Sequence, residues 1–167
     1  AARPRLARFD ALNPEPTAQD LVRPLAELTP AGWSQHLEAV IEHGLAVRGT
    51  LSPTAVSGPW HVTEPEFARG ETLRAVLASR GVALTDDPAS AVARVVAIAS
   101  RVPLPAEELA RLRVAALERE TVLIGLQNDA FLDDVPEAAL RISAADSTAL
   151  TREVVARRLA ALRRGGA

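Results

Sequence analysis

Two short apolar runs, separated by one helix, constrain the fold of this chain more than any other feature of its sequence. The runs are RVVAIAS at Arg94–Ser100 and TVLIGL at Thr121–Leu126, and both carry apolar side chains on consecutive positions. A strand with that pattern is buried on both faces, as in a parallel sheet that helices cover on each side. Between the runs, Pro105 followed by Glu107 and Glu108 marks the start of a helix. These signals predict a β-α-β unit with a crossover helix.

Further segments continue this alternation toward both ends of the sandwich. Short β-prone segments predict three more strands, at Trp60–Glu64, Val82–Thr85 and Ala139–Ser143. Helical spacing predicts a helix over Glu71–Arg80, closed by Gly81, and a last helix that Ser147 caps. We therefore predict an α/β fold, a three-layer αβα sandwich. Its sheet is mostly parallel and flavodoxin-like, with about five strands and right-handed connections.

The first third of the chain has a different pattern. Residues 1–48 are predicted to form a helical arm or interdomain linker, with helices that begin at Thr17 and near Pro30. Residues 49–59 are rich in Gly, Pro, Ser and Thr and are predicted to be a loop. The sandwich itself is assigned to residues 59–167, and the whole chain is expected to be one compact domain.

Composition excludes several classes of function. The chain has no cysteine and no lysine, which rules out disulfides, thiolate metal sites, a Schiff-base lysine and a P-loop lysine. A net charge of -2 and an aromatic content of 3% argue against a nucleic-acid partner. No apolar run could cross a membrane, and Ala1–Asp10 lacks the apolar region of a signal peptide. We expect a soluble protein of unassigned compartment, and the initial alanine suggests a processed chain or part of a longer one.

Polar residues follow the predicted strands at the edge where ligands of open α/β sheets bind. The candidate ligand residues at this edge are Glu64, Asn128, Asp129 and Asp146. Glu64, Asp129 and Asp146 could converge as a carboxylate cluster for a metal ion or for acid–base chemistry. The alternative is that they are turn and cap residues, because Asp, Asn and Ser form local hydrogen bonds at such positions. The local interpretation is favoured, since only their edge position links the three carboxylates.

Other sequence patterns typical of enzymes are absent. No glycine-rich phosphate loop follows a predicted strand, and no G-x-S-x-G nucleophile motif occurs. His36 and His43 lie about 10 Å apart on one predicted helix, too far to share a metal ion, and His61 lies in a predicted strand. The arginines of the last helix are predicted to form a solvated face. We predict no cofactor, no metal site and no catalytic residue in this chain.

Three stretches carry a resemblance to a known family. They are RPRLARFDAL at residues 3–12, the helix and turn at Trp33–Arg48, and residues 121–160. The last stretch has a hydrophobic strand, a polar loop at Asn128–Leu132, a short strand and a Ser/Thr-capped final helix. In this order the chain resembles the C-terminal αβα-sandwich domain of family 3 glycoside hydrolases, closest to bacterial β-N-acetylhexosaminidases. Asp129 stands where the family has proline.

The resemblance implies an accessory role. In that family the nucleophilic aspartate lies on an N-terminal barrel, and the acid/base His–Asp pair of the hexosaminidase subgroup lies on a barrel loop. The implied partner is therefore a barrel domain of the same polypeptide, which would bind the carbohydrate and hydrolyse β-linked amino sugars with retention. In the β-glucosidase subgroup the second domain can supply the acid/base carboxylate, and Glu64 and Asp129 occupy plausible positions for it.

Two other functions remain open from the sequence. The chain could be a free-standing flavodoxin-like module that binds a small ligand or a protein partner. It could also be a metal-dependent enzyme built on Glu64, Asp129 and Asp146.

Overall fold

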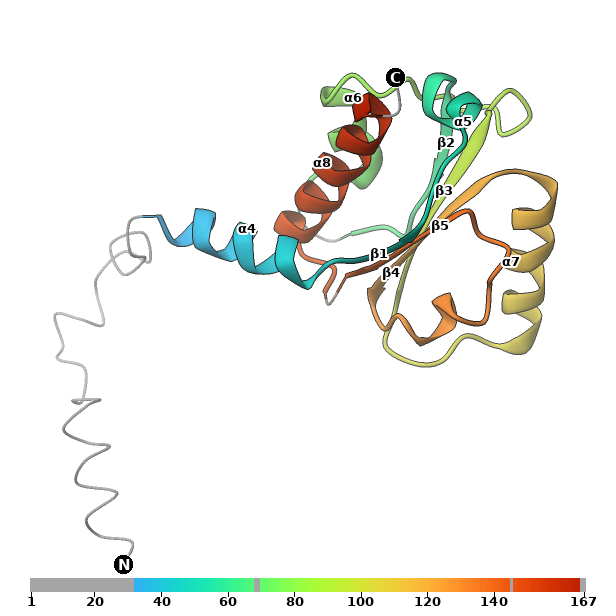
Figure 1. Cartoon of the computed structure of the whole chain (residues 1–167). Coiled ribbons are helices and arrows are strands. Elements are labelled where there is room, and N and C mark those ends of the chain that lie inside the picture. Colours follow the sequence, from blue (N-terminus) through green and yellow to red (C-terminus); the bar gives the residue numbers. More distant parts are fainter. Residues whose placement is uncertain (1–31, 68–69, 145, 166–167) are drawn as a thin grey trace, which may run out of the picture. The chain divides into compact units, whose positions relative to one another are not determined.

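The computed structural model describes residues 32–67, 70–144 and 146–165. Its centre is a five-stranded sheet with the strand order β1-β5-β4-β3-β2 (Figure 1). The strands are β1 (Ala46–Gly49), β2 (Trp60–Thr63), β3 (Ala93–Ser100), β4 (Thr121–Gln127) and β5 (Leu140–Ala144). β2, β3, β4 and β5 pair in parallel, and β1 pairs with β5 in the antiparallel sense. The predicted αβα sandwich with a mostly parallel sheet is therefore confirmed.

Helices cover both faces of the sheet (Figure 1). The helices are α4 (Trp33–Gly44), α5 (Pro53–Ser57), α6 (Leu73–Ser79), α7 (Ala106–Glu118), the 3-10 turn η1 (Ala130–Leu132) and α8 (Ala149–Gly165). The buried core on one face joins α5, α6 and α8 to the sheet, and the core on the other face joins α7 and η1 to it. No helix in the described part of the chain is long and apolar enough to cross a membrane.

The two apolar runs form the centre of the sheet, as predicted. β4 lies between β3 and β5, and its residues from Thr121 to Leu126 are all buried. Ile124 packs into the core beside α8, whereas its neighbour Leu123 packs into the core beside α7. Because consecutive side chains of a strand point to opposite faces, a strand covered on both sides needs apolar residues at consecutive positions.

Trp60 anchors the core next to α5. Its side chain is 0% exposed, and the indole N–H donates to the carbonyl oxygen of Ala55 at 2.6 Å. The Arg163 guanidinium lies over its ring, 5.2 Å from the centroid. The buried indole therefore has a hydrogen-bond acceptor and a cation partner, as a large amphipathic ring requires in a core.

The structure differs from the sequence prediction at one expected strand. Val82–Thr85 forms no regular strand; only Leu84 makes an isolated parallel bridge, to Trp60. The bridge nevertheless lies beyond β2, so the chain moves outward after β2 and returns past it to β3. This is the flavodoxin-like strand order, in which the strand expected at Val82–Thr85 is reduced to the single bridge between Leu84 and Trp60.

The segment before the sandwich also differs from its prediction. Ala46–Gly49, expected within the helical arm, is an antiparallel edge strand, because its backbone pairs with β5. The expected loop at residues 49–59 contains α5, which Ser52 caps through its hydroxyl group. The assignment of residues 1–48 as an arm and of 59–167 as the sandwich stays a prediction. The helix expected from Thr17 lies outside the described residues.

Candidate functional site

The carboxyl ends of the parallel strands define the edge at which a ligand of this fold would bind. After β2 the chain first pairs Leu84 on the outer side of β2, and it then crosses to the other side of β2 to form β3, β4 and β5 in succession. The switch in direction therefore lies between the ends of β2 and β3. Glu64 follows β2 at this point, and Asn128, Asp129 and Asp146 follow β4 and β5.

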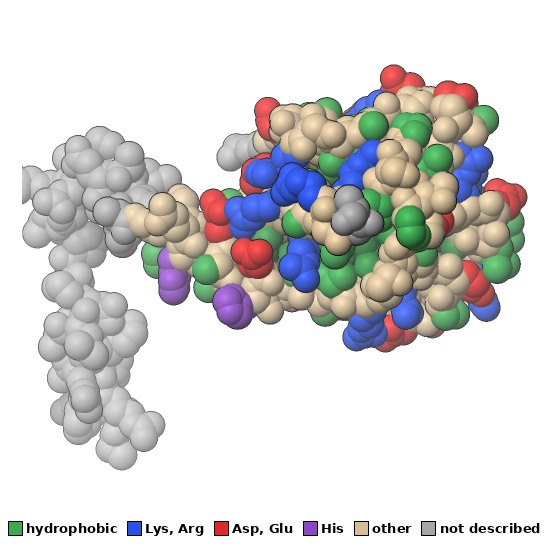
Figure 2. All heavy atoms as spheres, turned by 45° about the horizontal axis from the view of Figure 1, so that its top comes forward, with side chains coloured by type: hydrophobic (Ala, Val, Ile, Leu, Met, Phe, Trp, Pro, Cys, Tyr) green, Lys and Arg blue, Asp and Glu red, His purple; other side chains and the backbone are tan. Residues whose placement is uncertain are grey.

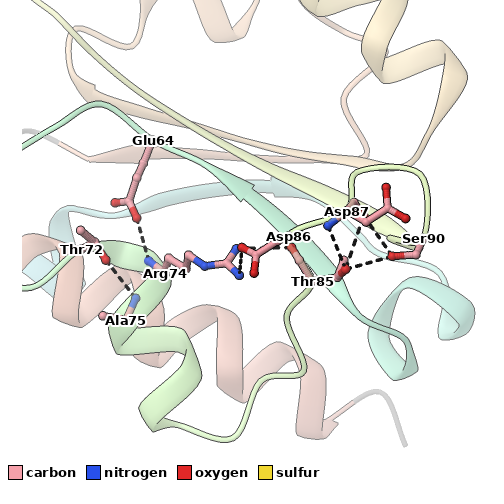
Figure 3. Close-up of polar contacts among 8 residues, drawn as sticks. All are labelled: Glu64, Thr72, Arg74, Ala75, Thr85, Asp86, Asp87 and Ser90. Carbon is pink, nitrogen blue, oxygen red and sulfur yellow. Dashed lines mark hydrogen bonds and ion pairs between the residues drawn. The ribbon is translucent and has the colours of Figure 1, made fainter.

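Glu64 binds the first turn of α6 with both carboxylate oxygens. Its Oε2 accepts from the Leu73 N–H at 2.7 Å, and its Oε1 accepts from the Arg74 N–H at 2.9 Å. Figure 3 shows the Glu64 side chain pointing to the start of this helix, where Thr72 accepts from the Ala75 N–H at 3.1 Å. The carboxylate thus occupies the positive end of α6, the position at which such folds commonly hold an anion.

A second polar network holds the segment after the Leu84 bridge against α6. The Arg74 guanidinium forms an ion pair with Asp86 at 2.7 Å and donates to the Thr85 carbonyl oxygen at 3.3 Å (Figure 3). The Thr85 hydroxyl in turn accepts from the Asp87 N–H at 3.2 Å and contacts the Ser90 hydroxyl at 2.9 Å. The bonds among Thr85, Asp87 and Ser90 are local turn interactions, whereas Arg74 links this turn to α6 and gives the Asp86 carboxylate its partner.

Asp146 organises the start of α8. One of its carboxylate oxygens accepts from the Thr148 N–H at 2.7 Å and from the Thr151 hydroxyl at 2.5 Å. Burial alone would raise the pKa of Asp146, but the hydrogen bonds from Thr151 and Thr148 outweigh it and leave the pKa below its usual value. The cap expected at Ser147 is made instead by Thr148, whose hydroxyl accepts from the Thr151 N–H at 3.3 Å.

Asn128 and Asp129 begin the loop that leads from β4 to β5. The Asn128 side-chain oxygen accepts from the Ala130 N–H at 3.0 Å, a local turn bond. The Asp129 carboxylate accepts a hydrogen bond from the Ser143 hydroxyl of β5. Asp129 and Ser143, but not Asn128, line a small hollow of about 70 Å³, together with Arg141 of β5. A hollow of this volume has room for a few water molecules.

The four sequence-predicted residues thus enter separate local networks. Glu64 bonds to α6, Asp146 bonds to α8, and Asp129 bonds to β5. Among the residues in the described ranges, no group of three His, Cys, Asp or Glu side chains is placed to hold a metal ion. Ligand binding by any of the four residues stays a prediction.

Arg152 is the residue of this edge that the sequence analysis missed. It was expected on a solvated face of the last helix, but it is 2% exposed. Its Nε donates to the Glu71 carbonyl oxygen at 2.9 Å, its Nη1 donates to the Ser147 carbonyl oxygen at 2.5 Å, and its guanidinium lies 4.0 Å from the centre of the Phe67 ring. Burial lowers the pKa of Arg152, and the nearby Glu64 charge opposes that effect. Arg152 therefore fixes the loop after β2 to the start of α8.

Gln127, at the end of β4, has an unusual backbone. Its φ of 78° lies in the left-handed region, and among the described residues no other non-glycine residue has a positive φ. The side-chain amide donates to the Ser147 hydroxyl at 2.9 Å. No sequence signal marks this conformation, because Gln has no special preference for positive φ.

The arginines at the other end of the sheet have a structural explanation. Arg80, Arg163 and Arg164 line a hollow of about 390 Å³ where α5, α6 and α8 all end. A separate group of arginine side chains lies beside α4 (Figure 2), where Arg157 forms ion pairs with Glu38 at 2.8 Å and with Glu42 at 3.4 Å; the chain has no lysine, so every blue side chain is an arginine. Arg163 donates to the Ser57 carbonyl oxygen at 3.0 Å, and burial lowers its pKa. Helix C-termini carry partial negative charge, which these guanidinium groups offset.

Comparison with known proteins shows what the fold is similar to. No family model matches the sequence, and no curated protein matches it. A glycoside hydrolase family 3 β-N-acetylglucosaminidase from Paenibacillus sp. str. FPU-7 superposes with a TM-score of 0.64 and 14% identity, over 81% of this chain and 31% of that one. The β-glucoside phosphorylase BglX superposes with a TM-score of 0.58 and 14% identity, over 84% of this chain and 32% of that one.

These similarities confirm the predicted resemblance at the level of the fold. The chain has the fold of a part of a family 3 glycoside hydrolase, and it spans about a third of the length of the two enzymes it matches. The two enzymes are named for different reactions, so the shared fold does not by itself assign a reaction.

Proposed function

We propose that this chain is the accessory C-terminal αβα domain of a family 3 glycoside hydrolase of the β-N-acetylhexosaminidase type. In this proposal a barrel domain of the same polypeptide binds the carbohydrate and hydrolyses its glycosidic bond. The observation that carries the proposal is the fold similarity, which extends over 81% of this chain but only 31% of the Paenibacillus β-N-acetylglucosaminidase. A domain that accounts for a third of such an enzyme leaves most of the enzyme to other domains.

The geometry of the sheet edge supports the accessory role. A retaining glycosidase needs two carboxyl groups about 5–5.5 Å apart, one of which acts as the nucleophile. Both oxygens of Glu64 accept backbone N–H groups of α6, and one oxygen of Asp146 accepts two bonds from α8. A carboxylate that accepts hydrogen bonds from a helix start in this way is a weaker nucleophile, because those bonds stabilise its negative charge. Glu64 and Asp146 are therefore assigned to folding rather than to bond cleavage.

In this proposal the chain contributes an ordered surface rather than reacting groups. The loop after β2 is fixed at one end by Glu64 and is bound to α8 by Arg152. In this proposal the described parts of the loop, residues 64–67 and 70–72, present a preformed surface to a neighbouring domain. Glu66 and Glu71 of this loop are exposed and available for that contact.

The test measures glycosidase activity of the purified 167-residue chain. The substrates are the p-nitrophenyl β-glycosides of N-acetylglucosamine and glucose, each with and without inorganic phosphate. We expect no release of p-nitrophenol in any of the four assays. Release that is lost in an Asp129→Asn variant would show that the chain carries its own catalytic carboxylate and would overturn the accessory role.

The gene supplies the second part of the test. The reading frame upstream of the codon for Ala1 is expected to encode a barrel domain, and co-expression of that barrel with this chain is expected to give N-acetylglucosaminidase activity. A start codon directly before Ala1 would contradict the proposal and favour a free-standing binding module. A barrel that cleaves only β-glucosides would keep the family assignment and overturn the hexosaminidase type.

A further inference from the structure

The outer face of α7 carries apolar side chains that the sheet does not cover. The inner face of α7 packs on the sheet core through Leu109, Leu112 and Ala116. On the other side Val114 is 56% exposed and Leu117 is 73% exposed. α7 covers its face of the sheet from outside, so this side of the helix points away from the domain (Figure 1).

The exposed residues have the spacing of a helix–helix seam. Ala110, Val114 and Leu117 follow one another at intervals of four and three residues. Alternating intervals of three and four place side chains in one stripe along a helix, which is the pattern of a coiled-coil contact. A shallow hollow of about 370 Å³ runs along this stripe and is lined by Ala110 and Val114. The small Ala110 and Ala115 side chains let another helix approach closely at that point.

Two opposite charges flank the stripe on the same side. Arg111 and Glu118, which also line the hollow, lie seven residues apart, each one position after a stripe residue. Arg111 and Glu118 occupy the same flanking position in successive turns of the pattern. In an antiparallel helix pair, flanking positions of this kind on the two helices face each other in reverse order, so Arg111 would face Glu118 of the second helix. In a parallel pair Glu118 would instead face Arg113 of the second helix, but equivalent stripe positions would meet, so Glu107, three residues before Ala110, would face its own copy, a like charge. The charges therefore fit an antiparallel partner with the same sequence.

The present contacts of these charges oppose such a pairing only weakly. Arg111 forms an ion pair with Glu107 in which both side chains are more than 70% exposed. Glu118 lies 3.6 Å from Arg94 and is 61% exposed. Exposed ion pairs of this kind contribute about 0–1 kcal/mol, so exchanging them for contacts across an interface costs little.

We propose that the outer face of α7 is a dimerisation surface for a second copy of this chain. The two α7 helices pack antiparallel about a twofold axis near Val114, with Leu117 of each copy over Ala110 of the other. Arg111 of each copy pairs with Glu118 of the other copy. This inference is independent of the proposed glycosidase assignment, because it rests only on α7.

The size of the contact determines how strong the association is. A helix of 13 residues is about 20 Å long, and its stripe is well below the ~800 Å² per partner of a stable interface. The dimer is therefore weak and depends on concentration. Sedimentation equilibrium of the full chain should show the mean mass rising between about 0.05 and about 1 mM, the range expected for a contact this small.

Charge reversal gives the decisive test. Arg111→Glu alone and Glu118→Arg alone each place like charges opposite one another, and both variants are expected to remain monomeric. The double variant restores opposite charges in the reverse order and is expected to regain at least half of the wild-type mass increase. Val40→Glu, on the exposed side of α4, is the control and should associate like the wild type. Circular dichroism confirms that each variant folds.

Three outcomes would overturn the proposal. A wild-type chain that stays monomeric over the whole concentration range has no such surface. Association that neither Leu117→Glu nor the single charge reversals weaken places the interface elsewhere. A double variant that stays as monomeric as the single variants shows that Arg111 and Glu118 do not meet.

Discussion

Replacing Arg152 with methionine tests the role of a buried cation at the edge of the sheet. Arg152 donates to the carbonyl oxygens of Glu71 and Ser147 and lies over the Phe67 ring. Methionine has a similar length and keeps an apolar contact with the ring, but it cannot donate a hydrogen bond. The substitution therefore removes the link between the loop after β2 and α8 while leaving little empty space.

The loss of stability follows from these contacts. Hydrogen bonds from a charged donor contribute about 1.5–3 kcal/mol each, so the loss of two costs about 3–6 kcal/mol. Part of this cost is recovered because a buried cation is removed; the same desolvation lowers the pKa of Arg152. The free energy of unfolding should fall by about 3 kcal/mol, which lowers the Tm of a domain of this size by about 6–12 °C.

The assay is thermal and urea unfolding followed by circular dichroism, with Arg158→Met as the matched control. Arg158 lies on the same helix and is exposed, so its replacement should change the Tm by less than about 2 °C. Hydrogen exchange adds a local measurement. Amides of the loop after β2 should exchange faster in Arg152→Met than in the wild type, and at the wild-type rate in Arg158→Met. A Tm drop below about 2 °C for Arg152→Met would refute the role assigned to its hydrogen bonds.

Three further predictions concern caps and glycines. Glu64→Ala leaves two N–H groups of α6 without their acceptor and should lower the free energy of urea unfolding by about 1–2 kcal/mol, whereas Glu66→Ala in the same loop should not. The pKa of Asp146 is depressed in the folded state, so its carboxylate stabilises the fold at pH values above the unfolded pKa of about 3.9. This stabilisation is lost as the pH falls through the lower folded pKa. The difference in free energy of unfolding between wild type and Asp146→Asn, measured with urea, should therefore shrink below about pH 4. Gly49→Ala places a Cβ against a backbone carbonyl at a φ of 92° and should lower the free energy of unfolding by more than about 2 kcal/mol. Gly81 also has a positive φ, of 77°, but open space around it, so Gly81→Ala should lower that free energy by only about 1 kcal/mol in the same assay.

The parts of the fold that follow from local pattern were predictable from the sequence. β3 and β4 were predicted because burial on both faces leaves an unmistakable apolar run, and α7 was predicted from its start signals. β1 was not, because Ala46–Gly49 is too short to show alternation and becomes a strand only by pairing with β5. The opposite case is Val82–Thr85, a β-prone segment predicted to be a strand, in which only Leu84 pairs with a strand residue.

The candidate site was predictable in position but not in its contacts. Glu64 and Asp146 lie at strand ends as expected, yet the groups they bind belong to the starts of helices whose placement the tertiary fold decides. The burial of Arg152 had no sequence signal, because an arginine in a basic helix is usually exposed. Its partners are backbone carbonyls and a phenyl ring, which no residue pattern marks.

The burial of Trp60 makes the intrinsic fluorescence of this chain easy to interpret. The chain has two tryptophans and no tyrosine, so emission excited beyond the absorption of phenylalanine comes from two indole rings alone. Trp60 is fully buried and Trp33 is 47% exposed. An aqueous quencher such as acrylamide should reach Trp33 first and Trp60 only when the contact between α5 and the sheet opens. A Trp33→Phe variant would leave one fluorophore, whose shift to longer wavelength reports solvent entry into the core without any added label.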